Sequence, residues 1–290
     1  MNTRIAPSPT GFFHLGTART AYHNWLVARA TGGLFTLRID DTDDDRNDEG
    51  HVQMIYDCMD WLGLDYDDTF RQSDRNKIYV DYAQFLLDID YATVADNGAI
   101  MFRFRDEDLI HFFNDTIAGK IETKQDDIDN LRSLVLMKSD GNPTYNFCSI
   151  VDDYLSKIDW IIRGADHIKN TIKQLHVIEA VQSLDNPVNY WKPKFTHVGL
   201  IHDMSNKKLS KRTGAKSVLD YKNEGVKPGA LLNTLLRIGW APTDPNFDSK
   251  HKIVTKDMAV DMILKEGNFR SAPGKFDPMK LAYYNKKHSN

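Results

Sequence analysis

The chain has 290 residues, 41% of them hydrophobic, which suffices for one large domain or for a core domain with an inserted or appended one. Its net charge of −4 argues against nonspecific nucleic-acid binding over the whole surface, although a local basic cluster remains compatible with a phosphate-bearing partner. No apolar run approaches a membrane span and the N-terminus resembles no signal peptide, so we expect a cytoplasmic protein without membrane contact.

The first predicted elements are a strand, a rigid loop and a helix within the first seventeen residues. Residues 4–6 can extend, and Pro7 and Pro9 turn the residues before them away from helix. The helical pattern then begins at His14, which places that side chain and the N–H groups near Gly16 at a helix N-terminus. Such an end attracts phosphate. The same spacing also fits an ordinary first strand and helix with a surface histidine.

Hydrophobic periodicity predicts the remaining elements in chain order. We expect strands at 34–39, 99–104, 134–137, 158–163 and 195–201. We expect helices at 52–62, 73–89, 106–118, 145–155, 166–183, 228–238, 256–265 and 278–286. The alternation of strands and helices indicates an α/β fold with a parallel sheet, and the different texture of residues 91–137 indicates an inserted subdomain.

A basic cluster follows the last predicted strand of the sheet. It contains Lys208, Lys211 and Arg212, with Ser210 between the lysines. A lysine ammonium is a mobile point charge that can follow phosphates as charge develops during transfer. Taken alone, such a run is more typical of a solvated basic loop.

Seen together, these stretches resemble the glutamyl-tRNA synthetase family of class I aminoacyl-tRNA synthetases. Residues 14–17 resemble its HIGH motif and residues 208–212 its KMSKS motif. The other matching stretches, in family order, are 4–11, 38–43, 143–145 with 151–153, 163–167, and 231–240.

The resemblance implies a Rossmann-type catalytic core. We expect its first half in residues 1–90 and its second half, with the KMSKS-like loop, in residues 138–215. It also implies an inserted acceptor-binding subdomain at 91–137, a helical C-terminal segment at 216–290, and no anticodon-binding region within these residues.

The implied activity is formation of glutamyl-adenylate from glutamate, ATP and Mg²⁺, followed by transfer to the acceptor end of tRNA. The catalytic residues implied by the resemblance are His14, Gly16, Lys208 and Lys211. Those implied for ATP are His14, Gly16, Thr17, Arg46, His167, Lys208, Lys211 and Arg212. Those implied for glutamate are Arg4, Ala6, Ser8, Asp40, Tyr145, Ser149 and Arg163.

Arg163 is the residue expected to select the amino acid. A guanidinium can donate two charge-assisted hydrogen bonds to a carboxylate, whereas a carboxamide presents an NH₂ donor to the same donors. Each mismatch costs about 1–3 kcal/mol, so glutamate is favoured over glutamine. The alternative is that Arg163 forms a structural ion pair with Asp152 or Asp153.

Several features depart from the family pattern. Asp40 stands where the family has a glutamate for the substrate ammonium, and Ser149 stands where it commonly has an asparagine. Cys58 and Cys148 are ninety positions apart and without metal-site spacing, so we expect two free thiols and no zinc site.

The sequence leaves several alternatives for the acceptor of the glutamyl group. Besides tRNA, with the protein acting as a monomer, the glutamyl group could pass to a modified tRNA base such as queuosine, to a small molecule or to a protein. A noncatalytic module that binds tRNA or a protein is a further alternative, which the two phosphate motifs argue against.

Overall fold

The structure is a computed structural model of the chain, and it describes residues 1–43, 45–184, 190–209, 216–244, 246 and 253–288. The helices are α1 (Leu15–Thr31), α2 (Glu49–Leu62), α3 (Asn76–Asp88), α4 (Gln125–Arg132), α5 (Tyr145–Leu155), α6 (Ile168–Val181), α7 (Val218–Asn223), α8 (Pro228–Leu236), α9 (Lys256–Met262) and α10 (Pro278–Lys287). Short 3₁₀ turns are η1 (Ser73–Arg75), η2 (Asp106–Asp108), η3 (Ala165–His167) and η4 (Gln182–Leu184).

The strands form several small sheets. They are β1 (Thr3–Ile5), β2 (Phe35–Ile39), β3 (Asp68–Arg71), β4 (Ala92–Val94), β5 (Ile100–Phe102), β6 (Phe112–Asp115), β7 (Gly119–Glu122), β8 (Val135–Met137), β9 (Trp160–Gly164), β10 (Lys194–Val198), β11 (Ile201–His202), β12 (Trp240–Pro242), β13 (Gly267–Phe269) and β14 (Gly274–Lys275). The largest has four strands in the order β7-β6-β10-β9, of which β9, β10 and β6 are parallel. Two sheets have three strands: β1-β2-β3 is all parallel, and β4-β5-β8 is antiparallel.

The sheets β1-β2-β3 and β7-β6-β10-β9 meet at β1 and β9. The backbone carbonyl of Asn2 accepts hydrogen bonds from the N–H groups of Asp159 and Trp160 at 2.9 and 3.3 Å. Further along, Asn24 of α1 donates from Nδ2 to the carbonyl of Ile162 at 2.9 Å. The chain order on the two sides of this junction reverses, and such a switch point in a parallel sheet leaves a crevice outside the carboxyl ends of the strands.

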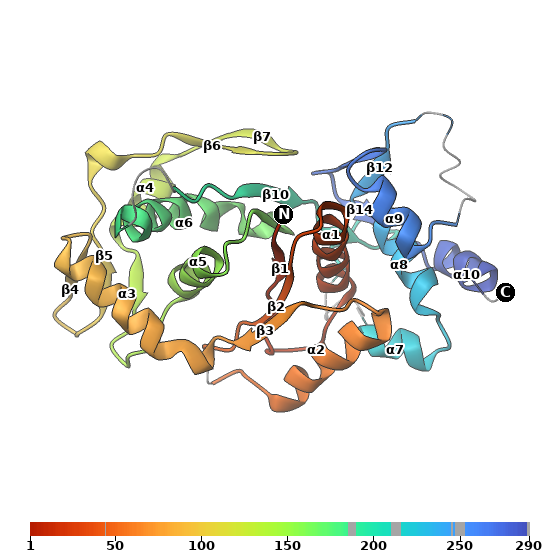
Figure 1. The fold of residues 1–290 in the computed structure, drawn as a ribbon, viewed down its shortest axis with the longest axis horizontal. Coiled ribbons are helices and arrows are strands. Elements are labelled where there is room, and N and C mark those ends of the chain that lie inside the picture. Colours follow the sequence, from red (N-terminus) through yellow and green to blue (C-terminus); the bar gives the residue numbers. More distant parts are fainter. Residues whose placement is uncertain (44, 185–189, 210–215, 245, 247–252, 289–290) are drawn as a thin grey trace.

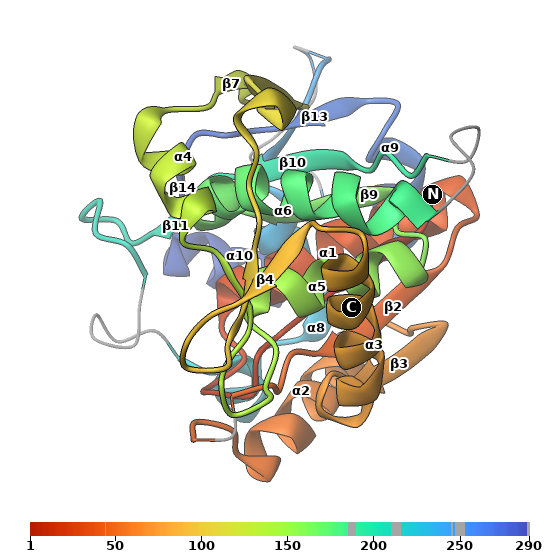
Figure 2. The same ribbon diagram turned by 90° about the vertical axis from the view of Figure 1, so that its left-hand side faces the viewer.

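Helices cover both sides of this central layer (Figure 1). The α1 and α8 helices lie on one side of β1 and β2, while α5 and α6 lie on the other, and the turned view shows α6 running beside β9 and β10 (Figure 2). Alternating side chains of β9 reach both sides, since Ile162 packs in a core with α1 and α8 and Ile161 packs in a second core with α5 and α6. The predicted α/β class with parallel strands is confirmed.

The α1 helix has a defined start and stop. His14 is its N-cap, and Gly32 ends it in a left-handed conformation with φ of 64°. The cap N–H at Gly32 bonds back to carbonyls of the last turn, which is a common way to end a helix. The expected boundaries at His14 and at the glycine pair are therefore those of the structure.

The helix expected at 106–118 is wrong. After η2, this stretch forms β6 and turns into β7 as an antiparallel hairpin. Buried and exposed side chains alternate along this segment, as in a strand: Phe113 is buried against Phe195 of β10, while Phe112 is exposed. The carboxylate of Asp115 then accepts from the N–H groups of Ile117 and Ala118, which stabilises the turn. The local helix lies later, at α4.

None of the described helices combines the length and the apolar composition that a membrane crossing needs.

Candidate active site

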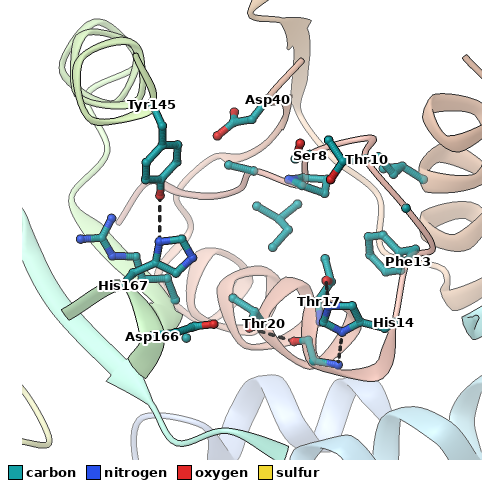
Figure 3. Close-up of a pocket in the computed structure, with 18 of the residues that line it drawn as sticks. Ser8, Thr10, Phe13, His14, Thr17, Thr20, Asp40, Tyr145, Asp166 and His167 are labelled. Carbon is teal, nitrogen blue, oxygen red and sulfur yellow. Dashed lines mark hydrogen bonds between the residues drawn. The ribbon is translucent and has the colours of Figure 1, made fainter. Parts of the chain in front are cut away.

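A pocket of about 870 Å³ opens at the carboxyl ends of β1 and β9, beside the first turn of α1 (Figure 3). Of the residues expected at the site, those that line it are Arg4, Ala6, Ser8, His14, Gly16, Thr17, Asp40, Arg46, Tyr145, Arg163, His167 and Lys208. The segment from Arg4 to Thr17 thus borders the pocket on one side, and the end of β9 with the start of α5 borders it on the other.

His14 lies over the N-terminus of α1. Its Nδ1 atom accepts hydrogen bonds from the backbone N–H groups of Gly16 and Thr17 at 3.0 and 3.3 Å. Because Nδ1 is an acceptor, the ring proton of the neutral imidazole is on Nε2. Two N–H groups expected to meet phosphate are therefore already used by the ring, and Nε2, which lies 3.4 Å from Oγ1 of Thr17, is its donor nitrogen.

Gly16 permits this arrangement because it has no Cβ atom. A Cβ at this position would lie 2.9 Å from Cε1 and 3.0 Å from Nδ1 of His14, closer than such atoms approach in proteins. Any larger residue would displace the ring. The glycine of the motif is explained by contact with the histidine two positions earlier.

A buried network of charges lies behind the pocket, which Arg4 and Asp40 border. Arg4 donates from Nε and Nη2 to both oxygens of Asp153, at 3.0 and 3.1 Å. Arg38 donates from Nη1 to Asp153 at 2.6 Å, and from Nε and Nη2 to Asp40 at 2.6 and 3.2 Å. These fork-shaped contacts fix the Asp40 carboxylate at the pocket edge.

Burial raises the pKa of Asp40 to about 6. Arg38 acts in the opposite direction through its charge and hydrogen bonds, and Asp152 adds repulsion. Arg38 does not offset the effect of burial on the Asp40 pKa, because its charge is shared with a second carboxylate, that of Asp153. Asp40 is consequently ionised at neutral pH and begins to take up a proton in mildly acidic solution.

Arg163 has a different environment. Its side chain is buried, with 6% of the residue exposed, and it borders the pocket. Nε donates to Nε2 of His197 at 3.1 Å, and Nη2 donates to Oγ1 of Thr171 at 2.7 Å. Among the described residues no carboxylate forms a salt bridge with it, and Asp153, the alternative partner, is held by Arg4 and Arg38.

Asp152, the other alternative partner of Arg163, is also engaged elsewhere. It accepts from Gln72, from Arg75 and from the hydroxyl of Tyr79 at 2.7–2.8 Å. Burial lowers the pKa of Arg163, which is the direction expected for a guanidinium that lacks a counter-ion. The pocket therefore contains a buried cation that forms no salt bridge with a carboxylate of the described residues.

Tyr145 and His167 form the wall opposite Ser8 (Figure 3). The Tyr145 hydroxyl lies 3.1 Å from Nδ1 of His167. Burial, with the charge of Arg163 added to it, lowers the pKa of His167 to about 4. His167 is therefore neutral at pH 7 and can serve as a hydrogen-bond partner.

Lys208 approaches the pocket from the segment after β11. Its Nζ atom lies 3.5 Å from Oδ2 of Asp166, which follows β9. This contact brings Lys208, the first residue of the second motif, next to the 163–167 segment. Lys211 and Arg212, which were expected to bind ATP, lie outside the described residues.

Two residues expected to bind a ligand, Ser149 and Arg46, lie behind the pocket and at its rim. Ser149 is buried, accepts a hydrogen bond from Gln174 at 3.0 Å and does not border the pocket. Arg46 is exposed and pairs with Asp43 at the pocket rim. Ser149 contacts the charge network behind the pocket through its carbonyl, which accepts from Arg38 at 3.2 Å.

The sequence reasoning missed some residues of the site. Arg38 and Asp166 lie inside matched motifs, so their positions were available although no role was assigned to them. His197 and Asp115 gave no such signal, because they are separated from Arg163 by 34 positions or more and meet it only through strand pairing.

Within the described ranges, no cluster of three or more His, Cys, Asp or Glu side chains is placed to hold a metal ion. Both cysteines are buried free thiols.

Comparisons with known proteins identify relatives over most of the chain. The family model described as tRNA synthetases class I (E and Q), catalytic domain, matches residues 1–99 and 91–271. A glutamate–tRNA ligase of Pelobacter propionicus is 37% identical over 98% of this chain and 65% of its own length. Glutamate–tRNA ligase 1 of Rubrobacter xylanophilus is 38% identical over 99% of this chain and 64% of its own length.

The fold is similar to a solved structure of the same kind. A glutamate tRNA ligase from Elizabethkingia meningosepticum, crystallised in complex with its amino acid, superposes with a TM-score of 0.83 at 26% identity. The match covers 99% of this chain and 69% of that one. The chain spans slightly less than two thirds of the length of the two curated relatives above.

Proposed function

The chain belongs to the catalytic-domain family of the class I tRNA synthetases for glutamate and glutamine, and from this premise we propose that it is a glutamate-activating ligase. It joins L-glutamate to AMP at the expense of ATP and then transfers the glutamyl group to the 3′ end of a tRNA. The observation that carries the choice of glutamate is Arg163, a buried guanidinium at the pocket without a carboxylate partner in the described chain.

The proposed amino-acid site lies between Arg163 and Asp40. Arg163 binds the side-chain carboxylate of glutamate through its Nη groups, and the ionised Asp40 faces the ammonium group. A neutral carboxamide would leave a donor against the donors of Arg163 and would not offset its buried charge, so glutamine binds less tightly. Tyr145 and Ser8 limit the width of this site.

The proposed ATP site lies between His14 and Lys208. The α-carboxylate oxygen of glutamate attacks the α-phosphorus of ATP, the bond to the bridging oxygen breaks, and pyrophosphate leaves with the bond's electron pair. Nε2–H of His14 and the Lys208 ammonium stabilise the negative charge that develops on the phosphates, and Lys211 is proposed to act with them. Positioning and charge account for the step without a protein nucleophile.

Mg²⁺ binds oxygen ligands and retains several waters, often through substrate phosphates. The part of the chain that the structure describes offers no cluster of ligands for it. The ion is expected to enter with the nucleotide and to neutralise phosphate charge there. The roles proposed for His14, Lys208 and Arg163 do not depend on a resident metal.

ATP–pyrophosphate exchange tests the activation step. We expect exchange with glutamate and at least tenfold less with glutamine at equal concentration, measured with and without tRNA because some synthetases of this family activate their amino acid only in its presence. Exchange with glutamine in preference to glutamate would overturn the assignment.

Arg163→Ala tests the residue that carries the proposal. We expect its KM for glutamate to rise about 100-fold, equivalent to about 3 kcal/mol, with a smaller change in kcat, because a charged hydrogen-bonded contact to the substrate is lost. Arg163→Lys keeps the charge but loses the forked geometry of the guanidinium. Its KM for glutamate should lie between those of the wild type and of Arg163→Ala. An unchanged KM in Arg163→Ala would assign Arg163 a structural role.

The acceptor is tested separately. Radiolabelled glutamate transferred to RNA as a 3′-terminal ester is released by mild alkali, whereas an amide on a modified base survives that treatment. We expect alkali-labile label. Alkali-stable label on RNA would identify a modified base as the acceptor. Label on a protein or on a small molecule would show that the acceptor is not RNA.

A further inference from the structure

Arg163 is held by neutral partners, which is unusual for a buried guanidinium. Its Nε and Nη2 groups donate to an imidazole nitrogen and to a hydroxyl, those of His197 and Thr171. Neither side chain borders the pocket. A carboxylate in either place would fix the guanidinium equally well but would also neutralise the charge that a substrate carboxylate needs.

The hydrogen bonds determine the tautomer of His197. An arginine N–H can only donate, so Nε2 of His197 has to accept and the ring proton is on Nδ1. Nδ1 lies 2.7 Å from Oδ2 of Asp115, and both side chains are fully buried. Nε2 also lies 3.0 Å from Oγ1 of Thr171, whose hydroxyl can donate to the ring while its oxygen accepts from Arg163. A neutral imidazole therefore satisfies all three groups.

Asp115 is itself fixed by several donors. Its Oδ2 also accepts from the backbone N–H of His197 at 2.9 Å, and its Oδ1 accepts from the N–H groups of Ile117 and Ala118 at 3.0 and 2.8 Å. Burial opposes ionisation, but the hydrogen bonds from His197 and from these amides hold the pKa of Asp115 below its usual value. The carboxylate is therefore a permanent acceptor for Nδ1–H.

Strand pairing aligns the three residues. His197 of β10 is the register partner of Arg163 on β9, and Phe195 of β10 is the partner of Asp115 on β6. The rings of Phe113 and Phe195 lie 6.1 and 6.3 Å from the His197 ring and limit its rotation. A turn in the 91–137 segment is thereby connected, through one ring, to the arginine at the pocket.

We propose that His197, held as the Nδ1–H tautomer by Asp115, is a positioning residue that orients Arg163 without neutralising it and so sets the preference for an anionic amino-acid side chain. This inference rests on the proposed function, because it concerns how that site selects its substrate. Thr171 supplies the second neutral acceptor.

Three variants separate positioning from folding. His197→Leu removes the acceptor, Thr171→Val removes the hydroxyl at nearly constant volume, and His197→Gln retains an acceptor at the position of Nε2. His176→Leu is the matched control, since His176 is also a buried histidine with both ring nitrogens hydrogen-bonded, but its partners are the backbone groups of Ile172 and Ile110 and it does not border the pocket. Melting temperatures of all four variants identify any that fail to fold.

We expect the KM for glutamate in ATP–pyrophosphate exchange to rise 10- to 100-fold in His197→Leu and about 10-fold in Thr171→Val, with kcat within threefold of wild type. The preference for glutamate over glutamine should fall by a similar factor. His197→Gln should recover most of both, and His176→Leu should change the melting temperature but not KM. An unchanged KM in His197→Leu or Thr171→Val, with wild-type exchange intact, would overturn the inference.

The tautomer can be measured without any activity. In long-range ¹H–¹⁵N spectra of the full chain at pH 7, the ring of His197, assigned by its loss in His197→Gln, should show a protonated Nδ1 and an unprotonated Nε2. A protonated Nε2, alone or in an imidazolium, would overturn the inference. Absence of glutamate-dependent exchange in the wild type would instead overturn the proposed function, and the spectrum would still report the tautomer.

Discussion

The two ring nitrogens of His14 differ, because Nδ1 caps α1 while Nε2, which lies 3.4 Å from Oγ1 of Thr17, is the donor that we propose for phosphate. A residue in a nucleotide motif can therefore be required for folding, for chemistry or for both. The two contributions are separable, since capping needs only a side-chain acceptor and phosphate binding needs the donor.

His14→Asn makes this separation. Asparagine is among the best N-cap residues, so we expect the free energy of unfolding to change by less than about 0.5 kcal/mol. The rate of ATP–pyrophosphate exchange should fall about 100-fold, because the donor to the developing phosphate charge is lost. His14→Ala should lose the rate and also about 1 kcal/mol of stability. A wild-type rate in His14→Asn would mean that the ring only caps the helix.

The pKa of Asp40 predicts a pH dependence of glutamate binding. If the ionised carboxylate holds the substrate ammonium, the KM for glutamate should rise as the pH falls through about 6, and by about tenfold between pH 7 and pH 5. Asp40→Asn should show a high KM with no inflection in this range. An inflection of equal size in Asp40→Asn would assign the titration to another group.

The contribution of Asp40 to the free energy of unfolding should increase as the pH falls, whereas glutamate binding weakens. Because the pKa of Asp40 is raised in the folded state above the value of about 3.9 in an unfolded chain, the folded state binds this proton more tightly. The stabilisation is complete below about pH 4 and is lost as the pH rises through about 6. Urea denaturation of the wild type and of Asp40→Asn between pH 4.5 and 7.5 would separate this contribution from those of other groups.

At the scale of elements, a buried carboxylate joins α3 to α5. Asp152 of α5 accepts from the Tyr79 hydroxyl of α3, from Arg75 of η1 and from Gln72 before it. The neighbouring Asp153 holds Arg4 and Arg38 on the pocket side. One turn of α5 thus supports the wall of the pocket on one side and anchors a helix on the other.

Tyr79→Phe tests this anchor. It removes one buried hydrogen bond to a charged acceptor while Arg75 and Gln72 remain, so we expect a loss of about 1.5–3 kcal/mol in the free energy of unfolding. Tyr66→Phe, at a half-buried tyrosine, is the control and should cost less than about 0.5 kcal/mol. Equal midpoints of urea denaturation for wild type and Tyr79→Phe would show that the anchor contributes nothing measurable.

Elements with strong local signals were predictable from the sequence. The α1 helix has an N-cap, apolar residues at helical spacing and a stopping glycine within one stretch, and α5 spans the residues expected for it. Residues 106–118 gave a helical pattern, but β6 forms because it can pair with β10, some eighty positions later. Such pairing has no local signature, and the same limit applies to β3 and to the short strands near the C-terminus.

Some residues of the candidate site were likewise predictable from the sequence, and others were not. His14, Tyr145 and Arg163 were singled out from motifs, and the structure brings them around one pocket. His197 and Asp115 could not be found, because their relation to Arg163 depends on the register of three strands. Sequence order can indicate residues that meet a ligand, whereas residues that orient them emerge only from the packing.

At the scale of the whole molecule, Arg19 connects segments that are far apart in the chain. It lies in α1 and is almost fully buried, with Nη2 donating to the carbonyl of Gly199 at 2.6 Å and Nη1 to that of Ile238 at 3.3 Å. Burial lowers its pKa to about 10, with Asp166 opposing the shift. The main core is also shared, because residues from Ile5 to Tyr284 pack in it.

Arg19→Lys tests whether this connection makes the chain a single cooperative unit. Lysine keeps the charge but cannot reach both carbonyls with a planar fork, so one buried acceptor loses its partner at a cost of about 1–3 kcal/mol. Arg29→Lys is the matched control on the same helix. Arg29 pairs near the surface with Asp65 and Asp67, and its replacement should cost less than about 1 kcal/mol.

Urea denaturation followed by tryptophan fluorescence and by circular dichroism measures both properties. Because Ile238 belongs to the same core as α1, we expect the midpoint for Arg19→Lys to fall while the two signals still coincide. Separated transitions would show that Arg19 is what couples the C-terminal helices to the first sheet. An unchanged midpoint would mean that the shared apolar core alone holds these segments together and that the two hydrogen bonds add no net stability.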